Sequence, residues 1–158
     1  MIDVDRLKAE HDEITQMATA LRTILNEPVA PQLGELFELR AKLTDSLIKH
    51  LKTEDWILYP VLLQSHDLKV ATTASELQAQ GGSFSADYAQ HCHRWTAETI
   101  KEDWPAYQSA SLFLLDRLEN RIDREETELY PLVGDRIGPD TVVKAAVTQF
   151  MPRRAQRR

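Results

Sequence analysis

Histidine and glutamate residues occur in this chain at a spacing that suits metal binding. His50 and Glu54 are four residues apart, which on a helix places an imidazole and a carboxylate on one face, about 5–6 Å apart at Cβ. His11 and Glu125 also fall in periodic apolar stretches, where a buried polar group needs a partner. Imidazole and carboxylate ligands suit iron, manganese or zinc, and a chain with one cysteine offers no thiolate site.

A further candidate ligand, His91, lies on the third predicted helix. The sequence leaves its role open, because Gly81-Gly82 interrupt the helical pattern before it and His93 faces the opposite side. Asp87 precedes His91 by four residues and could add a carboxylate to the same face, although an exposed or capping aspartate is the commoner case. His66 falls in a predicted turn, Ser65-His66-Asp67, and we expect it to be exposed.

Each of these residues also has an ordinary structural interpretation. A single histidine on an apolar helix face is more often a hydrogen-bonded core residue than a ligand, and His50 with Glu54 could form only a salt bridge along the helix. Three separate helices that each carry a buried histidine favour the metal interpretation, because each imidazole would otherwise carry its own desolvation cost. A metal-free internal ion network remains the alternative.

Periodic apolar residues define the helices that must position these side chains. In the first predicted helix they are Val4, Leu7, His11, Ile14, Ala18, Leu21 and Leu25. We predict a first helix from Asp3 or Asp5 to before Pro28, and a second over 32–64 with a kink or break at Pro60. The third is expected in two pieces, over 68–80 and from Phe84. The fourth starts at Asp103-Trp104-Pro105 and ends by Gly138-Pro139, and a short helix follows over 140–150. No alternating strand pattern of useful length occurs. The predicted fold is an all-α, up-down antiparallel four-helix bundle with a short C-terminal helix.

One helical segment occurs twice in the sequence. HLKTEDWILYP at 50–60 aligns with RIDREETELYP at 121–131, an offset of 71 residues that carries Glu54 onto Glu125 and Tyr-Pro onto Tyr-Pro. The same alignment puts Arg121 in the place of His50. The repeat predicts two helix hairpins related by an approximate twofold axis, with the second and fourth helices facing one another across the core.

Composition limits the class of protein. A length of 158 residues with 42% hydrophobic residues suits one folded domain, which we place at 1–151, with a basic, disordered tail at 152–158. The last seven residues hold four arginines and no acids, so a net charge of −6 for the chain leaves −10 for residues 1–151. An acidic body argues against nucleic-acid binding. A single cysteine, no leader pattern and no apolar run of about 20 residues predict a cytoplasmic protein without a membrane partner.

The order of the candidate ligands resembles a known family. His11, then His50-x-x-x-Glu54, then a third-helix histidine, then Glu125 followed by Leu-Tyr-Pro is similar to the hemerythrin-like HHE cation-binding pattern over about residues 5–135. The resemblance implies an up-down four-helix bundle with a non-haem iron centre, typically two irons bridged by the two motif carboxylates. By position, Glu54 and Glu125 would be those bridges, and His11 and His50 would bind one iron.

Arg121 departs from the family pattern, which normally has His-x-x-x-Glu on the fourth helix. A guanidinium has no free lone pair and stays charged, so it cannot ligate a metal, and it would repel a second cation nearby. We expect Arg121 to pair with Glu125 or Glu54. The resulting site is mononuclear iron or an incomplete di-iron site, with zinc or manganese as possible alternatives, bound by His11, His50, Glu54 and either Glu125 or His91.

The sequence also predicts neighbours and functions for the site. Tyr59 and Tyr130 are expected close to it, as phenol ligands or hydrogen-bond donors. The first functional hypothesis is an iron-binding sensor of O₂, NO, peroxide or iron, or a protein of iron and redox homeostasis; classical oxygen carriage is doubtful without a histidine-rich pair of irons. The alternatives are a metal-free bundle that acts as an interaction or regulatory module, with a protein partner or a second copy, and a peroxide-decomposing iron protein. No histidine has a glutamate three residues before it, which excludes a ferritin-type site.

Overall fold

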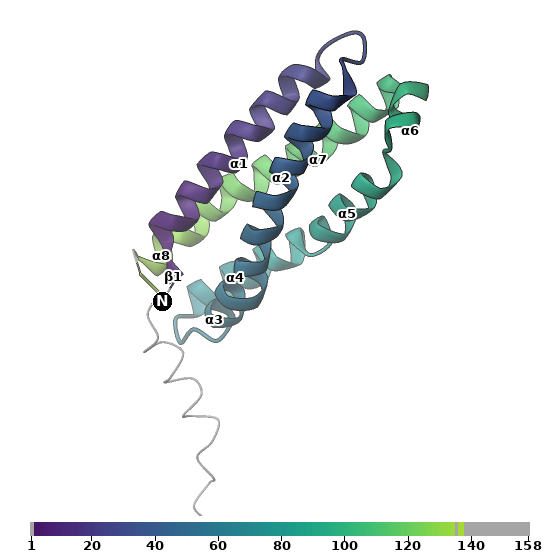
Figure 1. Cartoon of the computed structure of the whole chain (residues 1–158). Helices are drawn as coiled ribbons and strands as arrows, with labels where there is room; N and C mark the ends of the chain where they lie inside the picture. Colours follow the sequence, from purple (N-terminus) through teal and green to yellow (C-terminus); the bar gives the residue numbers. More distant parts are fainter. Residues whose placement is uncertain (1, 135, 138–158) are drawn as a thin grey trace, which may run out of the picture.

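Long helical rods run up and down alongside one another (Figure 1). The computed structural model describes residues 2–134 and 136–137. Its elements in chain order are β1 (Ile2–Asp3), α1 (Val4–Leu25), α2 (Leu33–Thr53), η1 (Glu54–Leu58), α3 (Tyr59–Leu63), α4 (Leu68–Gly81), α5 (Phe84–Arg94), α6 (Ala97–Glu102), α7 (Trp104–Arg124), η2 (Glu125–Leu129), α8 (Tyr130–Val133) and β2 (Arg136–Ile137). The predicted all-α bundle is confirmed. Within these residues no helix has both the length and the apolarity to cross a membrane.

Helix α1 forms as its sequence pattern predicts. The side chain of Asp3 accepts a hydrogen bond from the backbone N–H of Asp5 and so caps the first turn. All seven periodic residues of the predicted apolar face are buried, His11 among them. Asn26 closes the helix at its C-terminal end, before Pro28. The face that carries His11 therefore points into the bundle.

The second rod changes its winding before Pro60. Helix α2 continues into η1, a π-helical turn in which the N–H of Tyr59 bonds to the carbonyl of Glu54, five residues earlier, and then into α3. Proline has no N–H, and its ring crowds the carbonyl four residues before it, which a wider turn relieves. The predicted kink or break at Pro60 is therefore wrong in position: the irregularity lies at 54–58 and the helix runs on through Pro60.

The fourth rod repeats this arrangement. Helix α7 continues into the π-helical turn η2, where the N–H of Tyr130 bonds to the carbonyl of Glu125, and then into α8. Each glutamate of the sequence repeat thus starts a π turn. The rod ends at Val133, because Gly134 adopts a positive φ of 68° that residues with a side chain rarely adopt. The helix thus ends before Gly138-Pro139, as predicted.

The third rod consists of two helices, as predicted. Helix α4 ends at Gly81 and α5 begins at Phe84. The short helix α6 that follows was not predicted; Thr96 and Thr99 form its capping box. Asp103 then caps α7 by accepting a hydrogen bond from the N–H of Ala106, as the predicted start signal required.

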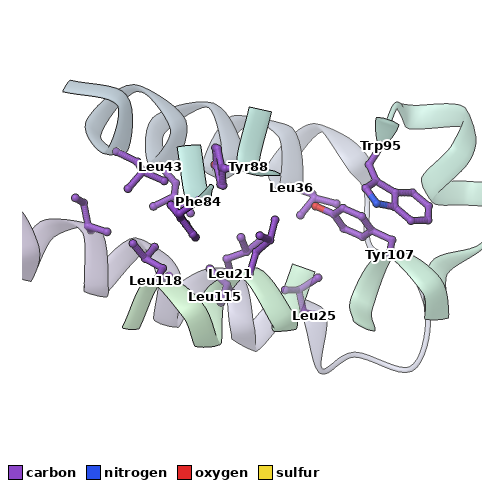
Figure 2. Close-up of a cluster of buried hydrophobic side chains, with 14 of the residues drawn as sticks. Leu21, Leu25, Leu36, Leu43, Phe84, Tyr88, Trp95, Tyr107, Leu115 and Leu118 are labelled. Carbon is purple, nitrogen blue, oxygen red and sulfur yellow. The ribbon is translucent and has the colours of Figure 1, made fainter. Parts of the chain in front are cut away.

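Two apolar cores fill the bundle and a polar layer separates them. The larger core includes Leu21, Leu25, Leu36, Leu43, Phe84, Tyr88, Trp95, Tyr107, Leu115 and Leu118 (Figure 2). The smaller core comprises Val4, Leu7, Leu58, Tyr59, Leu62, Val70, Ala74, Leu77, Leu129 and Tyr130. Along the rods, His11, Glu54 and Glu125 fall between members of the larger core and members of the smaller core, and His50 lies one turn before Glu54. The polar layer therefore has apolar side chains on both sides along the bundle axis.

A short strand pair ties the start of the chain to the end of the fourth rod. Ile2 pairs with Ile137 and Asp3 with Arg136 in antiparallel register. Strands of two residues are too short for any periodic signal, so the sequence did not predict them. The predicted helix at 140–150, the basic tail at 152–158 and the last part of the predicted domain 1–151 lie outside the described residues.

Candidate metal centre

Four predicted ligands meet in the polar layer. His11 from α1, His50 from α2, Glu54 from η1 and Glu125 from η2 each place one ligand atom within 4.8 Å of the others. All four side chains are buried, none more than 3% exposed. The cluster therefore combines donor atoms from three rods in a place that bulk water does not reach.

The atoms that face one another are all potential metal ligands. Nε2 of His11 lies 2.9 Å from Nε2 of His50, and Nε2 of His50 lies 3.0 Å from Oε1 of Glu54. Nε2 of His11 is 3.4 Å from Oε2 of Glu125. Neighbouring ligands around a first-row divalent cation, bonded at about 2.1 Å, are about 3.0 Å apart in octahedral and about 3.4 Å apart in tetrahedral geometry. These separations match a cation's ligand shell.

The outward nitrogens of both imidazoles are held by carboxylates. Nδ1 of His11 is 2.8 Å from Oε1 of Glu126, and Nδ1 of His50 is 2.9 Å from Oε2 of Glu10. A carboxylate accepts, so each Nδ1–H donates outward and leaves the Nε2 lone pair directed inward. Two lone pairs 2.9 Å apart repel unless a proton or a metal cation lies between them.

Arg121 holds the outward oxygens of both glutamates. Its Nη2 donates to Oε2 of Glu54 at 2.8 Å and its Nε donates to Oε1 of Glu125 at 3.0 Å. The expected pairing of Arg121 thus forms with both carboxylates at once. Tyr59 also donates to Oε1 of Glu125, at 2.8 Å, whereas the hydroxyl of Tyr130 is 3.5 Å from Oε1 of Glu54 and from Nε2 of His11.

One oxygen in this cluster is left without a partner. Oε2 of Glu125 is buried and makes no hydrogen bond to any residue the structure describes. A buried, unbonded carboxylate oxygen costs free energy. Because this oxygen faces His11, where the other inward atoms converge, a cation at that point would satisfy it.

Burial and charge shift the pKa values in the cluster strongly. Burial alone would lower the pKa of His11, but the carboxylates of Glu125 and Glu54 outweigh it and raise the pKa to about 10. The pKa of His50 is also raised, because Glu54 and Glu10 outweigh its burial. Burial would raise the pKa of Glu54, yet both imidazoles and Arg121 hold it well below its usual range. The pKa of Glu125 is raised by burial and by the charge of Glu54.

Two predicted site residues lie elsewhere. His91 hydrogen-bonds to Ser111 and stacks on Tyr107, and burial beside two arginines lowers its pKa to about 4. Asp87 is half-buried at the surface, where it accepts hydrogen bonds from Arg117 and Ser83. Neither belongs to the ligand cluster, so the expectations that His91 binds metal and that Asp87 supports the site are wrong.

The internal repeat explains the position of His91. In a sequence alignment at an offset of 70 residues, the buried face of α1 falls on residues of α4, α5 and the cap of α5 that are all buried or half-buried. In that alignment Val4, Leu7, His11, Ile14, Ala18, Leu21 and Leu25 fall on Ala74, Leu77, Gly81, Phe84, Tyr88, His91 and Trp95. His91 thus corresponds to Leu21, about 15 Å along the rod from the ligand level, whereas His11 corresponds to Gly81.

The second half of the repeat therefore has no imidazole at either of the two corresponding positions. Gly81 stands for His11, and Arg121 stands for His50. A Cβ built at Gly81 would lie only 3.1 Å from Nη1 of Arg121, so the guanidinium fills the room beside that glycine. The site keeps both glutamates but only one pair of histidines.

Two residues that the sequence did not single out complete the cluster. Glu10 and Glu126 are each next to a ligand in the sequence, and their side chains are 26% and 36% exposed. Both are half-exposed, so they do not belong to the periodic apolar helix faces by which the other site residues were predicted. A carboxylate within reach of a predicted ligand's second nitrogen is the only signal that could have indicated them.

The fold and the cluster define a helical bundle with a buried histidine and carboxylate site that suits a cation. A model of the hemerythrin HHE cation binding domain matches residues 2–133 of the chain. The protein therefore belongs to the hemerythrin HHE cation-binding family. The same comparisons found no matching curated protein and no matching solved structure.

Proposed function

We propose that the protein binds a single metal cation, iron in the first place, through Nε2 of His11, Nε2 of His50, Oε1 of Glu54 and Oε2 of Glu125. The observation that carries this proposal is the convergence of four acceptor atoms in a buried place, one of them an otherwise unbonded carboxylate oxygen. Membership of a cation-binding family supports it independently. Zinc or manganese would suit the same ligands.

The charge and position of Arg121 support one cation over two. Its guanidinium already bonds to both glutamates and occupies the half of the site where the repeat would place a second pair of imidazoles. A second metal there would lack histidine ligands and would face a fixed positive charge at short range. The positive charge of Arg121 thus compensates the two carboxylates, as a second cation otherwise would.

The chain's own residues set the properties of the site. Glu126 and Glu10 orient the imidazoles and increase their basicity, and the two apolar cores keep water away. An iron bound to four protein atoms would have coordination positions left for a diatomic molecule or a peroxide. We infer a role in sensing such a ligand, or iron itself, or in iron and redox homeostasis.

Metal analysis of single variants tests the proposal. Protein loaded anaerobically with Fe(II) and desalted should hold about one metal per chain by elemental analysis. His50→Ala and Glu54→Ala should hold less than a tenth of that, whereas His66→Ala, whose histidine is exposed in a turn, should equal the wild type. Unchanged iron content in both ligand variants would refute the assignment.

One observation favours a second candidate, a metal-free bundle that serves as an interaction or regulatory module. Arg121 with Glu54 and Glu125 forms an ion network that needs no metal to pair its charges. The two candidates predict different effects of metal on stability. If the protein binds a cation, a concentration of 100 times the Kd raises the free energy of unfolding by about 2.7 kcal/mol, and a metal-free module shows no such gain. Equal melting temperatures with iron and with a chelator would favour the metal-free module.

A further inference from the structure

A cavity lies on the far side of Arg121 from the glutamates. It has a volume of about 80 Å³ and opens where α4 meets α5, against α7. Its polar lining comprises Gln80, Gly81, Arg117, Asn120, Arg121 and Arg124. Among its lining residues are three arginines and no carboxylate. A cavity of this size holds several waters or one small ion.

Arg121 connects this cavity to the ligand cluster. Its Nε and Nη2 donate to Glu125 and Glu54. Its third nitrogen, Nη1, makes no hydrogen bond to any described residue and lies 3.1 Å from the place a Cβ would take at Gly81. The missing side chain at Gly81 thus leaves Nη1 open to the cavity, with two N–H donors free for a ligand.

The other two arginines of the lining are fixed by carboxylates outside it. Arg117 donates to Asp87 at 2.8 Å, and Arg124 donates to Glu128 through Nε and Nη2, both at 2.7 Å. These pairs direct donors of Arg117 and Arg124 to carboxylates that are not part of the cavity lining. Asn120 is a further polar residue of the lining.

We propose that this cavity binds a small oxyanion, of the size of formate or acetate, on Nη1 of Arg121, and that anion and metal binding strengthen each other through that guanidinium. The claim that the cavity binds an anion depends on the cavity alone. The claim that anion and metal binding are coupled rests on the proposed function, because it needs a cation in the ligand cluster.

The coupling follows from the charges that Arg121 contacts. Without a cation, the carboxylates of Glu54 and Glu125 lie behind the guanidinium and oppose an approaching anion. A divalent cation that replaces a single proton on the imidazoles adds one positive charge behind the guanidinium and so favours the anion. Coupling of this kind is reciprocal. We expect each ligand to tighten the binding of the other by a factor on the order of ten.

Two glycine variants test the cavity. In Gly81→Ala the new methyl group would cover Nη1, while the ligand residues stay unchanged. Gly34→Ala is the matched control, since Gly34 is also helical and a Cβ there meets nothing within 4 Å. Formate and acetate binding would be titrated by calorimetry, on metal-free protein and on protein loaded with Zn(II), which undergoes no redox change.

The proposal expects anion binding by the wild type and by Gly34→Ala, a loss of at least tenfold in Gly81→Ala, and a similar weakening in Asn120→Ala. Affinity should rise about tenfold on zinc loading. No binding to either form of the wild type, or binding that Gly81→Ala leaves unchanged, would overturn the site. Equal anion affinity with and without bound zinc would overturn the coupling. If zinc does not bind, the titration of the metal-free protein still tests whether the cavity binds an anion.

Discussion

The two imidazoles decide the chemistry of the cluster, because their protons compete with any cation. In the metal-free protein the carboxylates around His11 raise its pKa to about 10 and also raise that of His50. At neutral pH a proton is therefore held where a metal would bind. Binding must release it, which links metal affinity to pH.

We predict that metal affinity rises with pH across the neutral range. With its pKa raised to about 10, His11 holds its proton at pH 7. Metal affinity should therefore fall as pH decreases and increase by up to about tenfold per pH unit for each proton released. Zinc titrations by calorimetry in buffers of different ionisation enthalpy should show at least one proton released per metal at pH 7. A pH-independent affinity with no proton release would contradict this account of His11.

At the scale of the helices, the two π turns place the carboxylates. Glu54 and Glu125 each begin a π turn, and in each case a Tyr-Pro pair follows. The sequence repeat could predict equivalent helices, but not their winding, because the wide turn depends on the backbone hydrogen bonds around each proline. π turns of this kind are frequent at functional sites.

The end of the fourth rod offers a test at the same scale. Gly134 has φ 68° and ψ −173°, a conformation nearly restricted to glycine, so Gly134→Ala should lower the free energy of unfolding by about 1–3 kcal/mol. Gly34→Ala, inside α2, should be neutral or stabilising. Urea denaturation followed by circular dichroism measures both. A stability of Gly134→Ala equal to the wild type would show that this backbone conformation is not required.

The sequence predicted most of the fold and the centre of the site, for clear physical reasons. The stripe that includes His11 and Leu21 repeats every three to four residues, and His50 with Glu54 shares one helix face, so both signals are local. The position of His91 is not local: it depends on how far α5 lies along the bundle. The partners Glu10 and Glu126 likewise depend on how the rods pack, which no spacing within one helix reveals.

At the scale of the molecule, the bundle consists of two related halves with different site residues. The first half contributes His11, His50 and Glu54 to the cluster, and the second has Gly81, Arg121 and Glu125 at the corresponding positions. The predicted pseudo-twofold relation between the halves would thus hold an asymmetric site. One half supplies two imidazoles to the cluster, and the other supplies the guanidinium of Arg121.

This asymmetry predicts that a second metal site can be rebuilt. A double variant with Gly81→His and Arg121→His would give the second half the histidines of the first and would remove the repelling charge. We expect metal content to rise from about one to about two per chain by elemental analysis. Arg121→His alone is the control and should stay nearer to one, since it supplies only one of the two imidazoles. A double variant that still binds one metal would contradict the correspondence between the halves.

The central claim is that four side chains from three rods hold one cation between the two apolar cores. X-ray diffraction from iron-loaded crystals, measured on both sides of the iron absorption edge, tests it directly. We predict one anomalous peak within about 2.0–2.3 Å of Nε2 of His11, Nε2 of His50, Oε1 of Glu54 and Oε2 of Glu125. No peak at that point, or two peaks of equal height with one beside Arg121, would contradict the account.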